Sequence, residues 1–513
     1  MYDFFTSEIL RANEMPAPTW HRLDVNDAEI SVASNNPQHV ANYRLPQIKG
    51  GLAAMGCELE VNNMEFGEMS AFDEVLQSFE NENETDQASK RAVEIAVSEK
   101  TDPHDLDIPA LSTYQKRAVL NEMNASPARF FEMGAGIRAN RYMSAMTGKH
   151  TTLIAHSDKP GDATLYIHPQ GETPSCVFLD VIATENSECN ITVIYENDAE
   201  VEHEKNSSSY PTYYYLQERQ LVSGCSLRIF AGHNAKVNVN MVQALTTNTP
   251  VIDSSGYSLC AGASVNVEHR VLGGARTVTG LAADMHGDAS TLNVTTRYIG
   301  VGLQRHDFNY SVKQRGRNTT SNIDANGVLT AKSEKTLRGT IDFVHGCKGS
   351  VGNERETVLL ASEDAKNETE FERGRGREAE QSKSASGSTN NDANANNSTE
   401  LERGDARAGE AEEHDVTEDR NTHPANSLKT ECKTVPVILC DEEDVAGNHG
   451  ATIGHVRPEA RFYLNARGLN DAQIEHLFLS SFIDEARATF ADNERVLAQI
   501  DAFTNKVGIC AQD

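Results

Sequence analysis

The stretch AKVNV at residues 235–239 recurs as ASVNV at residues 263–267, 28 positions further along the chain. LNV at residues 292–294 repeats the pattern after another 27 positions. Alternation of apolar and polar residues is typical of a β-strand with one buried face. Its return at a near-constant period predicts a β-solenoid, in which each coil buries its inward side chains against the next. A β-sandwich with chance similarity between strands is the competing interpretation.

Strand-like segments of this kind begin near residue 150 and are rich in Val, Ile and Thr, as in CNITVIYE at residues 189–196. No helical pattern of about 10–15 residues separates them, which argues against βαβ units. Strand character returns at KTVPVILC, residues 433–440. We therefore predict a β-helical core over residues 150–367 and 433–456.

Three further regions lie outside this core. Residues 1–149 are predicted to form a mixed, partly helical N-terminal region with a polar, acidic excursion at 62–105. Residues 368–432 contain very few large apolar side chains, so they cannot bury enough surface to offset the entropy lost on ordering. We expect them to be a disordered insertion, and we expect residues 457–513 to form a C-terminal helical domain.

Helix boundaries are marked in the C-terminal region. Pro458 suits a first helical turn, and Gly468 suits the position just past a helix end. Asn470 and Gln473 have the spacing of a capping box. Four apolar residues follow at helical spacing, namely Ile474, Leu477, Phe478 and Phe482. This stripe packs on the rest of the chain, or part of it docks a partner.

The composition excludes several functions. A formal net charge of −30 argues against nucleic acid and against anionic membranes as partners. No apolar run is long enough to span a membrane and no signal-peptide pattern begins the chain, so we expect a cytoplasmic protein. Phosphate-loop, GxSxG and HExxH motifs are absent, and we expect no enzymatic activity. The nine cysteines form no CxxC pair, and most are expected to be buried.

One short segment gathers side chains that could bind a metal ion. Residues 440–454, CDEEDVAGNHGATIG, contain the Cys440 thiol, four carboxylates and the His449 imidazole. Such donors together can hold iron. Gly447 and Gly450 on either side of His449 indicate a turn that presents the imidazole. Cys440 is the weaker candidate because an apolar strand precedes it, which indicates burial. A polar turn without function is the alternative.

Residues 433–469 resemble the C-terminal signature of the SufB/SufD family. Segments 305–329 and 337–360 resemble the β-helix of that family, and PTWHRLDVN at 18–26 resembles the N-terminal segment of SufD-like members. The resemblance covers about residues 15–40 and 150–513, apart from the insertion. The matching residues of the signature are Pro436, Asp444, Val445, His449 to Thr452, Gly454, Phe462 to Leu464, Arg467 and Gly468.

Two departures separate this chain from SufB-type members. Aligned on Leu359 and Leu360, the chain has Glu356 where SufB-type members carry a cysteine considered a cluster ligand. It also reads Asn448-His449-Gly450 where the SufB motif reads Glu-His-Glu. Both departures favour a SufD-like subunit, in which Glu356 is a weak cluster-assembly candidate.

The resemblance implies a mainly β fold, a right-handed parallel β-helix flanked by N-terminal and C-terminal helical regions. It implies a scaffold that pairs with a SufB-like subunit, or with a second copy of itself, and docks a SufC-like ATPase through its C-terminal helices. It implies no stably bound cofactor, only a transient iron–sulfur cluster at a subunit interface. His449 matches the family histidine thought to help build that cluster and is the candidate metal ligand.

Two other functions compete with this interpretation. A SufB-like subunit would hold the nascent cluster directly. A carbohydrate-active β-helix enzyme would usually be secreted and would carry aromatic platforms in a groove, whereas this chain has one Trp and 6% aromatic residues. Reconstitution of the isolated chain with iron and sulfide would separate the two SUF roles, and binding to an oligouronide would favour the enzyme.

Overall fold

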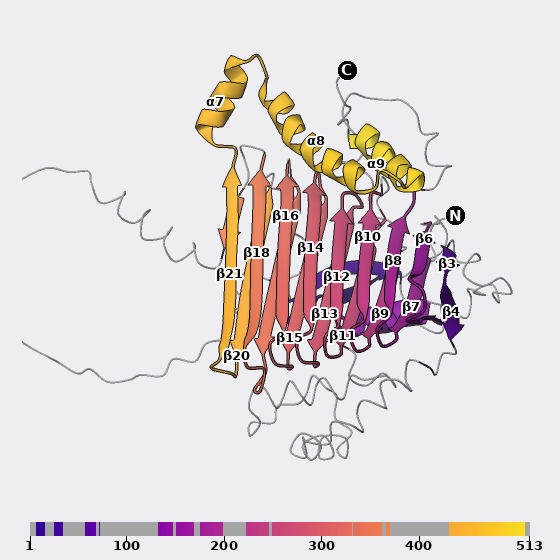
Figure 1. The fold of residues 1–513 in the computed structure, drawn as a ribbon. Coiled ribbons are helices and arrows are strands. Elements are labelled where there is room, and N and C mark those ends of the chain that lie inside the picture. The colour runs from indigo at the N-terminus through magenta and orange to yellow at the C-terminus, as the bar shows by residue number, and fades with distance from the viewer. Residues whose placement is uncertain are drawn as a thin grey trace, which may run out of the picture.

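Two long sheets of almost entirely parallel strands form the body of the protein (Figure 1). The structure, a computed structural model, describes residues 7–15, 25–33, 57–67, 71, 132–146, 150–168, 175–197, 222–245, 249–330, 332–361, 366–369 and 430–507. Within them the mainly β fold is confirmed, with parallel sheets of many strands and few helices.

The first sheet contains, in spatial order, β21 (Val445–His455), β18 (Ser350–Leu360), β16 (Thr320–Leu329), β14 (Thr291–Gly300), β12 (Ser264–Val271), β10 (Lys236–Gln243), β8 (Glu188–Tyr195), β6 (Gly161–Ile167) and β3 (Cys57–Asn62). The second contains β19 (Lys366–Thr369), β20 (Glu431–Cys440), β17 (Glu334–Phe343), β15 (Arg305–Gln314), β13 (Arg276–Met285), β11 (Val251–Leu259), β9 (Ser223–Ala231), β7 (Ser175–Ala183), β5 (His150–Ala155) and β4 (Met64–Gly67). From β5 to β18 the chain alternates between the two sheets. Of the strands described in these sheets, only β3 and β4 run antiparallel to their neighbours.

The sequence repeat is visible as strand register. Val237 in β10 pairs with Val265 in β12, and Val265 pairs with Leu292 in β14. The repeated apolar residues therefore stack directly above one another between the sheets. One continuous core of buried side chains draws on both sheets, as expected when alternating strands turn one face inward.

The corners of the repeat have their own sequence signal. The turn before each of six first-sheet strands contains a residue with positive φ, a conformation that Asn and Gly adopt most readily. These residues are Asn186, Asn234, Gly262, Ala289, Asn318 and Gly349. Five of the six are Asn or Gly, so local preference and the fold agree at nearly every corner.

The N-terminal region packs on the second sheet. Strands β1 (Ser7–Ala12) and β2 (Ala28–Ala33) form an antiparallel pair, and helix α5 (Gly136–Met146) covers part of the same apolar cluster. The buried Arg338 of β17 donates a hydrogen bond to the backbone oxygen of Asp27 at 3.0 Å. The described part of this region thus contains more strand than helix.

The expected excursion and insertion begin or end inside strands. The excursion predicted at 62–105 starts within β3 and includes β4, and its other residues, apart from Asn63 and Ala71, lie outside the described residues. The insertion predicted at 368–432 needs a similar correction, because β19 includes residues 368 and 369 and β20 begins at Glu431. Residues 370–429 lie outside the described residues, so the prediction of disorder there stays a prediction.

Three helices follow β21: α7 (Pro458–Ala466), α8 (Asp471–Thr489) and α9 (Glu494–Val507). The predicted boundaries are confirmed. Pro458 occupies the first turn of α7, and Gly468 has a φ of 92° just past its end. Asn470 and Gln473 form the capping box of α8.

Helices α8 and α9 lie along one end of the first-sheet strands, whereas α7 projects away from the body beside β21 (Figure 1). The apolar faces of α8 and α9 share one buried cluster with the ends of the first-sheet strands. None of the helices in the described ranges has the length and apolar character required to cross a membrane.

Candidate functional site

All the predicted cluster-assembly residues lie at one end of the body. We call β20 and β21, joined by the turn at residues 441–444, the terminal layer (Figure 1). Strand β21 pairs with β18 and has no strand on its other side among the described residues, whereas β20 pairs with β17 and, over four residues, with β19.

Side chains alternate between the interior and the solvent in the strands at this end. In β18, Glu354, Glu356 and Val358 are buried, whereas Arg355 and Thr357 are exposed. Residues in register on parallel strands face the same side of a sheet. The β21 residues that face the interior are therefore Gly447, His449, Ala451 and Ile453.

His449 lies in the middle of strand β21, so the prediction of a turn built by its neighbouring glycines is wrong. Its register partner on β18 is Glu354, and the imidazole is exposed because no strand of the described residues covers it. Gly447 instead leaves room for the Phe343 ring, which a Cβ at that position would approach to 3.0 Å. No side chain crowds Gly450, which has no described atom within 4 Å of the Cβ position.

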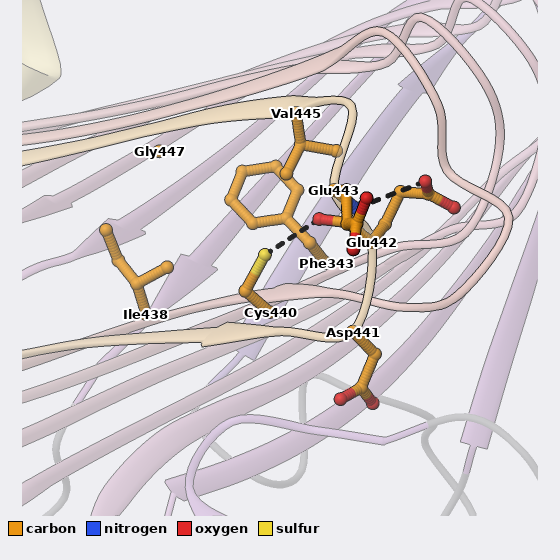
Figure 2. A pocket seen from close by; sticks show the side chains of 8 residues that line it. All are labelled: Phe343, Ile438, Cys440, Asp441, Glu442, Glu443, Val445 and Gly447. Carbon is orange, nitrogen blue, oxygen red and sulfur yellow. Dashed lines mark hydrogen bonds between the residues drawn. The ribbon is translucent and has the colours of Figure 1, made fainter.

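Cys440 ends strand β20 and lines a pocket beside the 441–444 turn (Figure 2). Its expected burial is wrong: the seven other described cysteines are buried, but Cys440 is exposed. Its thiol donates to the backbone oxygen of Glu442 at 3.0 Å. The Glu442 carboxylate accepts the N–H of Gly346, and this bond lowers the pKa of Glu442. The pocket therefore joins a thiol and acidic side chains to an apolar wall made by Phe343, Ile438 and Val445.

Glu356 lies on β18, one layer below the terminal layer, and both of its carboxylate oxygens already have partners. It forms an ion pair with Lys335, and the two side chains are 1% and 0% exposed. The hydroxyl of Tyr298 donates to Oε1 at 3.1 Å, and that of Thr434 donates to Oε2 at 2.5 Å. With its charge neutralised and both oxygens accepting hydrogen bonds, this carboxylate is a structural element of the interior.

Glu354, two residues earlier on the same face, is a further candidate that the sequence did not single out. It is 4% exposed, and its Oε2 has no hydrogen-bond partner among the described residues. Burial, followed by repulsion from Glu356, raises the pKa of Glu354 to about 8. The signal was present in the alternation, because any residue two positions from an inward Glu356 also points inward.

The structure does not gather the predicted residues into one ligand set. Cys440 lines the pocket, whereas His449 and Glu356 do not. Across the described ranges, no group of three or more His, Cys, Asp or Glu side chains is arranged to hold a metal ion. The terminal layer instead presents separate donors along an open face.

A ladder of seven asparagine side chains crosses the solvent face of the first sheet and ends at the free edge. Each Nδ2 donates to the Oδ1 of the previous layer, and the first bond of the series runs from Asn190 to the carboxylate of Asp162. A carboxylate only accepts, so Asp162 fixes the direction of every amide. Asn448 therefore donates to Asn353 at 3.0 Å and turns its Oδ1 toward the open edge of β21.

The four residues of the predicted ATPase-docking stripe on α8 differ in burial. Ile474 is fully buried, and Phe482 packs against the body, so these two residues hold the helix in place. Phe478 is partly buried and Leu477 is 46% exposed. The more exposed aromatic residues lie on α7, which the stripe did not include: Phe462 is 75% exposed and Tyr463 is 54% exposed.

Comparison with known proteins gives a family match over more than half of the chain. The model of the SufBD core domain, described as part of SUF system FeS cluster assembly, matches residues 175–370 and 379–482. These ranges include most strands of both sheets, the terminal layer and the first part of the C-terminal helices.

Two curated relatives are similar to this chain. The iron–sulfur cluster assembly protein SufD of Bacillus subtilis (strain 168) is 20% identical over 356 residues, which are 68% of this chain and 64% of the relative. An iron–sulfur cluster assembly SufBD family protein of Synechocystis sp. is 37% identical over 59 residues, 12% of this chain and 13% of that protein. The chain thus spans less than two thirds of the length of either relative.

Proposed function

This chain belongs to the SufBD family of the SUF iron–sulfur cluster assembly system, and we propose that it acts there as a SufD-like, non-enzymatic scaffold subunit in the cytoplasm. The observation that carries the SufD-like role is the state of Glu356. SufB-type members have a cysteine at this position. Here the carboxylate of Glu356 forms an ion pair with Lys335 and accepts hydrogen bonds from Tyr298 and Thr434. Residue 356 itself therefore supplies no thiol to hold a cluster.

The two sheets are, in this proposal, the faces of one right-handed β-helix. The alternation of successive strands between the sheets and the shared core support this arrangement. Right-handed crossover is the strong general preference for parallel strands connected in sequence. The terminal layer is then the last coil, with its inner face open.

The subunit partner is a SufB-like protein, or a second copy of this chain, that adds a strand to β21. This 11-residue edge contains no Lys, Arg, Asp, Glu or Pro, the residues that proteins commonly use to block such pairing. The outward Oδ1 of Asn448 continues the ladder toward that strand. A nascent iron–sulfur cluster, the cargo of the complex, would be built where the open layer meets the partner, with His449 as one of its ligands.

The SufC-like ATPase docks on α7 and the adjoining part of α8. Phe462, Tyr463 and Leu477 supply the exposed apolar surface. Helix α8 is fixed from behind by Ile474 and by Arg270, which donates to Glu485 at 3.2 Å. Movement of the ATPase would therefore be transmitted to the first sheet through β12.

A SufB-like role is the second candidate, because Cys440 is exposed at the open end. In that case the isolated chain would retain a cluster, and Cys440→Ser would lose it. In the SufD-like role the isolated chain retains none.

Co-expression with the SufB-like and SufC-like proteins of the same organism tests the proposal. We expect a complex that survives size-exclusion chromatography and takes up iron and sulfide anaerobically. We expect ATP hydrolysis only when the SufC-like protein is present. Failure of the three chains to form a complex would contradict the proposed role.

A further inference from the structure

Glu354 is a buried carboxyl group that shares the attraction of Lys335 with the Glu356 ion pair and lacks a hydrogen-bond partner of its own at Oε2 among the described residues. Its neighbour Glu356 has a buried cation and two hydroxyl donors, whereas Oε2 of Glu354 has no partner among the described residues. An unpaired buried polar group costs about 1–3 kcal/mol. A glutamate kept at such a position is therefore more readily explained by a ligand than by stability.

The carboxylate lies directly beneath the open face of the terminal layer. A Cβ on Gly339 of β17 would meet Oε1 of Glu354 at 2.0 Å, so the carboxylate reaches across the interior to the second sheet. The register partner of Gly339 in the terminal layer is Pro436, and that of Glu354 is His449. The carboxylate is therefore placed one layer below these two residues.

We propose that Glu354 and His449 together bind ferrous iron at the open end, with the carboxylate holding it from below and the imidazole from the edge strand. This inference deepens the proposed function and rests on it. Carboxylate oxygen and imidazole nitrogen are a donor pair that suits ferrous iron. Two protein donors leave the remaining positions for sulfide and for ligands of the partner subunit.

Among the described residues, the open face of the terminal layer gives access to this pair through His449. His449 is exposed, whereas Glu354 is 4% exposed. Iron would arrive at the imidazole from the open face and reach the carboxylate next. The site is incomplete without the partner, consistent with the absence of a three-residue ligand group in the described part of this chain.

The test uses the complex with the SufB-like and SufC-like subunits and compares wild type with Glu354→Gln. The amide keeps the shape of the side chain but is a poor iron ligand. We expect several-fold less iron retained after anaerobic loading with ferrous iron and sulfide, at an unchanged or higher melting temperature. Co²⁺ absorption provides a second readout: the visible bands of bound Co²⁺ should change in Glu354→Gln.

A second variant moves the carboxylate without removing it. Gly339→Ala places a methyl group where Oε1 lies, and the flexible end of Glu354 is what must give way. We expect iron retention to fall as in Glu354→Gln while the fold persists. Glu356→Gln is the matched control: it disturbs the ion pair with Lys335 and should lower stability, but complexes that remain folded should keep their iron.

The outcomes separate this inference from the proposed function. If the wild-type complex takes up no iron and sulfide, the proposed function fails. If His449→Ala loses iron while Glu354→Gln and Gly339→Ala retain it, Glu354 is no ligand and this inference alone is overturned. If Glu354→Gln loses iron and also melts at a lower temperature, Glu354 has a structural role. That outcome would overturn this inference too.

Discussion

The ammonium group of Lys335 and the carboxylate of Glu356 form an ion pair between the two sheets, where their side chains are 0% and 1% exposed. Lys335 also donates to the backbone oxygen of Lys433 at 3.2 Å and contacts the Cys432 thiol at 3.6 Å. The pair therefore ties β17 and β18 to the first residues of the terminal layer. Removing one partner would leave the other charge buried and uncompensated.

Lys335→Met should consequently destabilise the protein by about 3 kcal/mol, the usual order for breaking a buried ion pair. Urea unfolding followed by circular dichroism measures this loss. Lys433→Met is the matched control on β20, because its ion pair with Glu431 is partly exposed and should contribute less than about 1 kcal/mol. Equal effects of the two substitutions would show that burial of the pair is not what matters.

Stability should fall with rising pH because of Asp253. This interior carboxyl group accepts a hydrogen bond from the Tyr195 hydroxyl, and burial raises the pKa of Asp253 to about 7. Between about pH 4 and pH 7 the unfolded state has lost this proton while the folded state retains it. Each pH unit in that window therefore removes on the order of 1 kcal/mol from the free energy of unfolding.

Asp253→Asn isolates that contribution, because the amide does not titrate. The difference in stability between wild type and variant should change steadily from about pH 4 to pH 7 and then level off. Chemical unfolding at a series of pH values measures the difference. Parallel curves for the two proteins would mean that Asp253 has an ordinary pKa in the folded state.

His449→Ala should impair cluster assembly and spare the fold. The side chain is exposed on an edge strand, so its removal leaves no cavity. We expect iron and sulfide bound by the reconstituted complex to fall several-fold, with melting and subunit association close to wild type. His455→Ala, on the same strand and also exposed, is the control and should retain full loading.

The double substitution Phe462→Ala/Tyr463→Ala should weaken ATPase docking. Helix α7 has no buried residue, so these aromatic side chains contribute little to folding. A loss of at least tenfold in affinity for the SufC-like protein is expected if they are anchors of the interface. Isothermal titration calorimetry measures it, and Phe66→Ala, an equally exposed aromatic residue on β4, should leave the affinity unchanged.

Much of the fold could be predicted from the sequence because its signals are local. Alternation and the repeat of 27 and 28 residues predicted strands that pair in the observed register. Pro458, Gly468, Asn470 and Gln473 predicted where helices begin and end, since caps depend on residues within one turn. The insertion boundaries were less accurate because apolar content changes gradually along the chain.

The site was predicted less well because it depends on strand pairing. Gly447 and Gly450 suggested a turn at His449, but pairing with β18 holds this segment as a strand. Cys440 follows an apolar strand, yet it is exposed because β19, the described strand beyond β20, pairs only with residues 431–434. Local composition cannot show which strand is last in a sheet.

The strand period, the inward or outward direction of each side chain and the helix caps all follow from the amino-acid sequence, since they depend on neighbouring residues. Which inward residues are covered depends on the tertiary fold. Glu354 and His449 are 95 positions apart in the chain and become register partners because β21 adds to β18. Burial follows from the layer above, so a carboxylate one layer down is closed in while the imidazole at the edge stays open.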